Sequence, residues 1–350
     1  MENWKTVRLG DVCEKGSSNI AQNEITDNNG EYPIYGAAGF IKNVDFYKQD
    51  KPYIGIVKDG AGVGRVSVHP AKSSLIGTMQ YIFPKENIDI KFLAEFLKYQ
   101  NLSRFYTGAT IPHIYFKDYQ NIPLKLPPLQ KQKHISAVLD KCTALITKHK
   151  LMLEKYDTLI KSRFIEMFGD PVLNEKGWEL KTLPELGEFG RGVSKHRPRN
   201  APELLGGKYP LIQTGDVANA NLYITDYEST YSEEGFKQSK MWKAGTLCIT
   251  IAATIAKTAI LTFDSCFPDS VVGFTPNENT NNLFINYWFS FFQKILEEQA
   301  PAVAQKNINL QVLSELKIIS PPIELQNDFA AFVQQIDKSK FENNYKELVA

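Results

Sequence analysis

A cationic stretch, RGVSKHRPRN at residues 191–200, holds the side chains of this sequence best suited to bind an anion. A glycine and a proline interrupt it, which favours a loop. Lysine and arginine bind phosphate, and the guanidinium group also forms paired hydrogen bonds with guanine. The residues leave two interpretations open, contact with DNA and a solvated loop balanced by acidic residues around Glu185 and Glu188. The candidate residues are Arg191, Lys195, His196, Arg197 and Arg199.

The first third of the chain holds weaker candidates for DNA contact. The glycine-rich KDGAGVGR at 58–65 leads into a strand-like run and lacks Gly-Lys-Ser/Thr, which argues against a nucleotide-binding loop and favours a tight hairpin. Base edges could also be read by four uncharged residues, although tyrosine is more often a core residue. The uncharged residues are Tyr35 and Tyr115 in the first third and Gln213 and Thr214 beyond it. The weaker charged or polar candidates of the first third are Lys58, Arg65, Arg104, Thr110 and His113.

Motifs of catalytic chemistry are missing from the sequence. It contains no His-Glu-x-x-His, no Gly-x-Ser-x-Gly and no Walker lysine. The two Pro-Pro pairs follow Leu126 and Ser320, where a base-modifying methyltransferase would have Asn or Asp. A metal-dependent nuclease needs carboxylates and a lysine at one site. Asp269, Glu315 and Lys317 supply these types, but a turn and a strand edge explain them more simply. We predict no catalytic residue and no bound metal or cofactor in this chain.

Composition indicates a globular protein without a global charge bias. The chain has 350 residues, 43% of them hydrophobic, and a net charge of +1. This length favours two domains. The four cysteines show no C-x-x-C spacing, which is typical of reduced residues in an intracellular protein. The first residues lack the apolar run of a secretory signal, and no run is long enough to span a membrane.

The elements that must position these side chains include one very long helix, predicted over residues 131–170. No glycine or proline interrupts the chain from about Gln132 to Phe168. Apolar residues recur every three or four positions over four heptads, which is typical of a coiled coil. Such a helix is about 55 Å long at about 1.5 Å per residue. The predicted stripe is Ile135, Leu139, Cys142, Ile146, His149, Leu153, Tyr156 and Ile160.

An internal repeat divides the chain at the scale of domains. YPIYGAAG at 32–39 matches YPLIQTGD at 209–216, and LPPLQKQ at 126–132 matches SPPIELQ at 320–326. In both copies Pro-Pro leads, through a glutamine, into an apolar-periodic helix. The second helix, at 326–350, is shorter than the first and carries Phe329, Val333 and Ile336. Pseudo-twofold symmetry predicts that the two helices pair antiparallel, giving an α+β protein of two similar domains with mixed sheets and short helices.

These repeats resemble the specificity subunit of type I restriction–modification enzymes. Supporting segments are TGATIPHIYFKDYQNIPLKLPP at 107–128 and AQKNINLQVLSELKIISPP at 304–322, which resemble the end of each target-recognition domain in that family. The resemblance implies a recognition domain at residues 1–130, the long helix at 131–170, a second recognition domain at 171–325 and the shortened helix at 326–350.

The resemblance implies a noncatalytic subunit that reads a split double-stranded DNA target, and it favours contact with DNA for the cationic loop at 191–200. It also implies two methyltransferase subunits and restriction or translocase subunits as partners. S-adenosylmethionine, ATP and magnesium would belong to those partners, and the location would be the cytoplasm of a bacterium or archaeon. The residues by themselves leave two alternatives, a stand-alone DNA-modifying or DNA-cleaving enzyme and a coiled-coil scaffold with no DNA role. The bases recognised do not follow from the sequence, because readout depends on side-chain placement in the groove.

Overall fold

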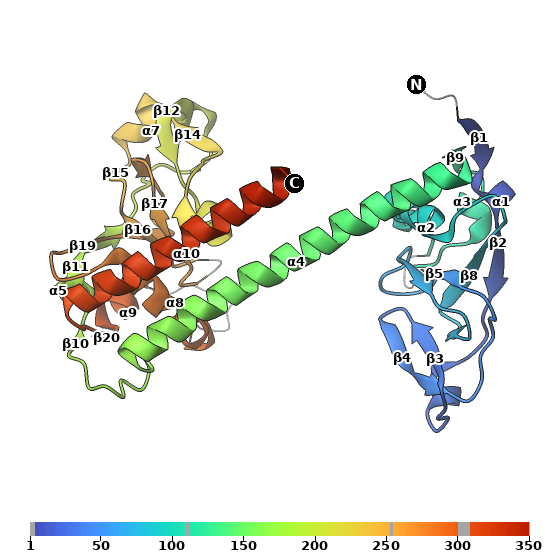
Figure 1. The fold of residues 1–350 in the computed structure, drawn as a ribbon. Coiled ribbons are helices and arrows are strands. Elements are labelled where there is room, and N and C mark those ends of the chain that lie inside the picture. Colours follow the sequence, from blue (N-terminus) through green and yellow to red (C-terminus); the bar gives the residue numbers. More distant parts are fainter. Residues whose placement is uncertain (1–3, 109–111, 253–254, 300–308, 350) are drawn as a thin grey trace. The chain divides into compact units, whose positions relative to one another are not determined.

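The computed structural model describes residues 4–108, 112–252, 255–299 and 309–349. The chain forms two compact units, a first unit at residues 1–149 and a second unit at residues 150–350 (Figure 1). Helix α4, Leu129–Phe168, contributes its first half to the first unit and its second half to the second unit. Each unit is described by itself below.

The first unit is built on a four-stranded antiparallel sheet with the order β2-β8-β5-β6. The central strand β5, YIGIV, is buried along its whole length, and Ile54 faces Ile82 on one neighbour and Val68 on the other. Helix α2 contributes Leu93, Ala94 and Leu97 to the same core. The strands are β2 Cys13–Ser17, β5 Tyr53–Val57, β6 Val66–His69 and β8 Met79–Pro84.

Smaller elements complete the first unit. Strand β3 pairs antiparallel with β4 and parallel with β7, and β1 pairs with β9 just before α4 begins. These strands are β1 Lys5–Arg8, β3 Tyr32–Gly36, β4 Gly39–Val44, β7 Ser74–Leu75 and β9 Pro123–Leu126. The helices are α1 Leu9–Val12, α2 Ile90–Tyr99 and α3 Phe116–Tyr119, with 3-10 helices η1 Gln22–Ile25 and η2 Leu102–Phe105.

The second unit contains a five-stranded sheet, β11-β19-β16-β17-β13, and a four-stranded sheet, β14-β12-β18-β15. Strand β10 pairs with β20 near the start of α10. The larger sheet comprises β11 Gly187–Arg191, β13 Tyr223–Ile224, β16 Leu247–Thr250, β17 Thr258–Leu261 and β19 Val271–Pro276. The other strands are β10 Leu180–Lys181, β12 Leu205–Leu211, β14 Ser229–Tyr231, β15 Met241–Trp242, β18 Ser265–Cys266 and β20 Ile318–Ile319. The helices are α5 Leu183–Leu186, η3 Pro202–Leu204, α6 Thr214–Asn219, α7 Glu233–Lys237, α8 Asn282–Gln299, α9 Leu310–Glu315 and α10 Ile323–Val349.

The two units share one topology. The order β2-β8-β5-β6 in the first unit corresponds to β11-β19-β16-β17 in the second. The smaller sheets also agree, because β3 and β12 each take one antiparallel and one parallel neighbour. Each unit places a helix after its central sheet, α2 or α8, and a long helix after its closing strand, α4 or α10. The predicted α+β fold with two similar domains is confirmed.

Within the second unit, α10 runs antiparallel to the C-terminal half of α4 (Figure 1). The rings of Phe168 and Phe329 lie 5.6 Å apart, near the end of α4 and the start of α10. At the other end of the pair, Lys340 Nζ lies 3.4 Å from a carboxylate oxygen of Asp157. Residue numbers therefore rise on one helix as they fall on the other, as the predicted pseudo-twofold arrangement requires.

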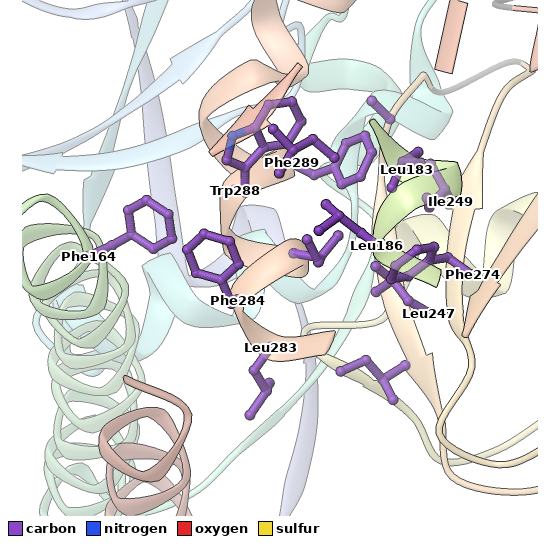
Figure 2. Close-up of a cluster of buried hydrophobic side chains, with 14 of the residues drawn as sticks. Phe164, Leu183, Leu186, Leu247, Ile249, Phe274, Leu283, Phe284, Trp288 and Phe289 are labelled. Atoms are coloured by element: carbon purple, nitrogen blue, oxygen red, sulfur yellow. The ribbon is translucent and has the colours of Figure 1, made fainter. Parts of the chain in front are cut away.

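The pair of helices packs on α8 through aromatic residues. Figure 2 shows the rings of Phe164 and Phe284 facing each other, and their centroids lie 5.4 Å apart. Trp288 and Phe289 continue the cluster toward Leu183 on α5 (Figure 2). These contacts connect the helices to the sheet of the same unit, so the second half of α4 belongs to the hydrophobic core of the second unit.

The predicted coiled-coil stripe is only partly covered within this chain. Ile160 is buried among α4, α8 and α10, as are Phe329 and Val333, and Ile336 packs at the edge of this core. His149, Leu153 and Tyr156 are half-buried, as is Ile135. Leu139, Cys142 and Ile146 are exposed. Helix α10 has 27 residues against 40 for α4, and its start packs against the C-terminal end of α4.

Both long helices begin three residues or fewer before the predicted positions. Helix α4 begins at Leu129 and α10 at Ile323, each directly after its Pro-Pro pair. The carbonyl of Pro128 accepts hydrogen bonds from the backbone N–H groups of Lys131 and Gln132. The second proline of each pair thus starts the helix, which agrees with the preference of proline for helix N-termini.

Candidate nucleic-acid interface

In the first unit, the glycine-rich loop at 58–65 joins β5 to β6 and brings the predicted cations together. A Cβ atom at Gly64, where φ is +86°, would clash with the backbone nitrogen of Ser103. The loop therefore packs tightly against η2, next to Arg104. On its other side, Gly60 N–H donates to the carbonyl of Pro112 at 3.0 Å. Three segments distant in the sequence thus form one surface. The predicted tight hairpin is confirmed, because β5 pairs antiparallel with β6.

An acidic residue organises this surface. Asp59 lies 2.7 Å from Nδ1 of His113 and 3.1 Å from Nζ of Lys58. Arg65 donates from its guanidinium group to the carbonyl of Ala37 at 2.8 Å. These contacts hold the cationic side chains in fixed places on the edge of the unit.

The remaining candidates of the first unit have different environments. Arg104 donates to the side chain of Gln100 at 3.0 Å and lies over the ring of Phe105. Tyr115 is exposed, with the Lys117 ammonium group over its ring. Tyr35 is half-buried and stacks near His69, so it is a packing residue. Thr110 lies outside the described residues.

In the second unit, the predicted cationic loop follows β11 and is held by contacts to other segments. Arg191 ends the strand with an exposed side chain. Beyond it, the Gln238 side-chain oxygen accepts hydrogen bonds from the backbone N–H groups of Lys195, at 2.5 Å, and His196, at 2.9 Å. His196 also lies 3.8 Å from a carboxylate oxygen of Glu203. The loop is therefore ordered by its backbone, and Lys195 remains exposed.

Asp269 binds both of the remaining arginines of this loop. Its carboxylate lies 3.3 Å from Arg197 Nη2 and also accepts a hydrogen bond from Arg199 Nη2. Glu185, which belongs to the acidic stretch of the alternative interpretation, is bound to Thr182. Hydrogen bonds from Thr182 lower the pKa of Glu185. The single negative charge of Asp269 lies against the two positive charges of Arg197 and Arg199, so these three side chains keep a net positive charge.

A polar hollow of about 190 Å³ opens beside Arg199. Its lining includes the two residues that we considered as base readers, Gln213 and Thr214, together with Asn200 and Ser270. The amide and hydroxyl groups can both donate and accept hydrogen bonds, which direct readout of base edges requires. The structure thus gathers Arg199, Gln213 and Thr214 at one place, although Arg199 lies 14 positions before Gln213.

The described residues offer little for catalysis. Burial raises the pKa of the Cys13 thiol to about 12 and also raises the pKa values of Cys248 and Cys266, so these thiols are poor nucleophiles. Asp269, which we had weighed as a metal ligand, is bound to arginines. Within the described ranges, no group of three or more His, Cys, Asp or Glu residues could hold a metal ion.

Among the residues that the structure describes, no helix is long and apolar enough to cross a membrane.

The residues missed by sequence reasoning are mainly acidic or polar. Asp59 and Asn200 lie within the glycine-rich and cationic stretches but were not singled out there, and Ser270 carries no motif. The roles of Asp59 and Asp269 depend on contacts with residues more than 50 positions away. A glycine-rich loop with a cation at each end was the only signal that could have drawn attention to Asp59.

Comparison with known proteins gives a consistent result. The family described as "Type I restriction modification DNA specificity domain" matches twice, at residues 1–155 and 175–349. A putative type I restriction enzyme specificity subunit of Haemophilus influenzae is 25% identical over 325 residues, covering 88% of this chain and 80% of the relative. The type I restriction enzyme EcoDI specificity subunit of Escherichia coli is 22% identical over 365 residues, covering 95% and 81%.

Solved structures share the fold. The S subunit of a type I restriction–modification system from Mycoplasma genitalium superposes with a TM-score of 0.66 at 15% identity, covering 98% of this chain and 92% of that one. A chain from a study of complex assembly and conformational transition of the type I system gives a TM-score of 0.55 at 15% identity, covering 99% and 93%.

Proposed function

Because the chain belongs to the type I restriction–modification DNA specificity family, we propose that it recognises a DNA target in two separate parts, one with each unit. The chain is a noncatalytic recognition subunit, as its relatives are specificity subunits. Its task is then to bind DNA sequence-specifically and to direct the chemistry of other subunits.

The observation that carries this proposal is duplication of the fold without duplication of the contact residues. Both units use the same strand order, but the surface of the first is built around Lys58, Arg65 and His113. The surface of the second is built around Arg197 and Arg199 and includes a polar hollow. Different side chains on one scaffold favour different base sequences, so the proposed target is asymmetric.

The proposed partners are two methyltransferase subunits and the restriction or translocase subunits of the system. S-adenosylmethionine, ATP and magnesium are proposed to bind to those partners. The exposed apolar residues on the first half of α4 support a role for this helix in assembly, since they form an apolar stripe on its surface. That stripe comprises Val138, Leu139, Cys142, Leu145 and Ile146.

Sequencing of methylated sites tests the proposal. The chain is expressed with its methyltransferase partners in cells that lack other methylation, and modified adenines are mapped. The expected result is one asymmetric motif of two short parts with unspecified bases between them. A continuous motif, or methylation by the chain without its partners, would contradict the proposal. Duplex binding that is insensitive to salt would argue against the proposed phosphate contacts.

A further inference from the structure

A buried glutamine lies in the first turns of each long helix. Gln132 on α4 is 0% exposed, and Gln326 on α10 is 1% exposed. Each lies five residues after the first proline of its Pro-Pro pair. A buried amide must find hydrogen-bond partners to offset its lost hydration.

In the first unit, Gln132 uses both ends of its amide. Nε2 donates to the carbonyls of Pro127, at 2.9 Å, and Asn87, at 3.1 Å. Oε1 accepts from the backbone N–H of Asp89 at 2.8 Å. One side chain thus joins the proline turn and the start of α4 to the segment that leads into α2.

In the second unit, Gln326 repeats these three bonds. Nε2 donates to the carbonyls of Pro321, at 2.8 Å, and Asn279, at 3.2 Å. Oε1 accepts from the backbone N–H of Asn281 at 2.9 Å. All the partners are backbone groups, so the arrangement depends on the path of the chain and persists although the surrounding side chains differ.

Asp89 and Asn281, whose backbone N–H groups donate to the two glutamines, also lie at the starts of helices α2 and α8. The Asp89 carboxylate caps α2 by accepting from the backbone N–H groups of Lys91 and Phe92, and it receives a hydrogen bond from Ser136 on α4. Asn281 accepts from the N–H of Leu283 on α8, and its amide donates to Asn327 on α10. Each glutamine therefore fixes the long helix to the N-terminus of a helix in its own unit.

Small changes in helix direction have large effects at a distance. Helix α4 has 40 residues and is about 60 Å long. A change of about 3° in its direction moves its far end sideways by about 3 Å, close to the rise of about 3.4 Å per base pair. A fixed angle at the start of the helix is needed if the rod is to measure DNA to the nearest base pair.

We infer that Gln132 and Gln326 are positioning residues, which set the direction of each long helix and so the number of unspecified bases between the two parts of the target. The inference rests on the proposed function of reading a split target. The glutamines touch no base in this proposal and act through the helices that they hold.

The test replaces each glutamine by methionine, which keeps much of the volume and removes all three hydrogen bonds. Gln132→Met and Gln326→Met chains are assembled with the partner subunits, and methylated sites are sequenced. We expect the fraction of sites with the wild-type spacing to fall at least twofold, while sites with one base pair more or less appear. Both parts of the motif should stay the same. Gln130→Met and Gln334→Met, which alter exposed glutamines on the same helices, serve as matched controls with unchanged spacing.

An unchanged spacing in folded methionine variants would overturn the inference. Where a methionine variant fails to fold, the milder Ser136→Ala and Asn327→Ala variants decide, because they remove the additional hydrogen bonds from α4 and α10. These are expected to broaden the spacing less, and no broadening in either would again overturn the inference. A wild-type complex that yields no two-part motif would instead contradict the proposed function.

Discussion

At the scale of single residues, Asp269 restrains the charge of the cationic loop. It lies between Arg197 and Arg199, whose guanidinium groups it binds. Replacing it with asparagine releases positive charge toward the DNA. We expect Asp269→Asn to raise affinity for random duplex DNA and to lower discrimination, because phosphate attraction does not depend on sequence. The slope of log affinity against log salt should steepen by up to about 0.9 for each cation that gains a phosphate contact.

Asp264→Asn is the matched control for this experiment. Asp264 also pairs with a cation, Lys243, at 2.7 Å, but in the turn between β17 and β18. This variant should leave the affinity and the salt slope for random DNA close to those of the wild-type chain. An Asp269→Asn chain with unchanged affinity at every salt concentration would show that the arginines do not face DNA.

Another residue-scale prediction concerns His69, which is buried beside the rings of Tyr35 and Tyr53. Burial lowers its pKa from 6.5 to about 4, since the charged form loses hydration. The unfolded chain therefore takes up this proton at a higher pH than the folded chain. The part of the unfolding free energy that depends on neutral, buried His69 is fully present above pH 6.5 and is lost as the pH falls from about 6.5 to about 4. The loss is on the order of 2–3 kcal/mol.

Urea unfolding of wild-type and His69→Gln chains at pH 7 and pH 4.5 measures this contribution. Glutamine can replace the hydrogen bond that Nε2 of His69 forms with Ser67 at 2.7 Å, but it does not titrate. We expect the drop in unfolding free energy between the two pH values to be smaller in the variant. Equal drops in both chains would assign the acid sensitivity to other groups.

At the scale of elements, α4 offers two isoleucines in opposite environments. Ile160 is 0% exposed between α10 and α8, whereas Ile146 is 57% exposed. Ile160→Ala removes buried methyl groups and leaves a cavity, which costs about 2–5 kcal/mol. Ile146→Ala should change the unfolding free energy of the isolated chain by less than about 0.5 kcal/mol. Urea unfolding measures both values, and equal effects would mean that the helix pair is not packed as described.

The long helices could be predicted because their signals are local. Pro-Pro before Leu129 and Gly-Asp-Pro after Phe168 mark the ends of α4, and the absence of glycine and proline between them marks its continuity. The extent of pairing could not be predicted in the same way. Apolar spacing reveals a stripe on a helix but does not tell which part of that stripe a partner covers, so Ile146 and Ile160 look equivalent in the sequence.

The interface itself was only partly predictable. The arginines of the loop at 191–199 are visible as a cluster, but their shared carboxylate is 70 and 72 residues away. His113 likewise meets Asp59 across 54 residues. Such contacts depend on the order of the strands in the sheets and not on a local sequence pattern. The internal repeat indicated that the two halves are alike, but it did not give the order of their strands. Gln213 and Thr214 were considered from their types, yet only the fold places them beside Arg199.

At the scale of the whole molecule, the two compact units predict that the two parts of the proposed target are read independently. Lys58→Ala with Arg65→Ala should weaken binding through the first unit, and Arg197→Ala with Arg199→Ala through the second. Each pair of changes is expected to cost about 1–3 kcal/mol. Because the residues belong to separate units with no shared partners among the described residues, the four changes together should cost the sum to within about 0.5 kcal/mol.

Titration of the assembled complex with its target duplex measures these losses, and mapping of methylated sites supplies the second readout. Each pair of changes should relax one part of the motif and leave the other part intact, because removing a base contact from one unit does not disturb the base contacts of the other. A combined effect no larger than that of one pair would mean that both sets of cations serve a single shared site. In that case the duplicated fold would serve assembly, and the split target would have to be abandoned.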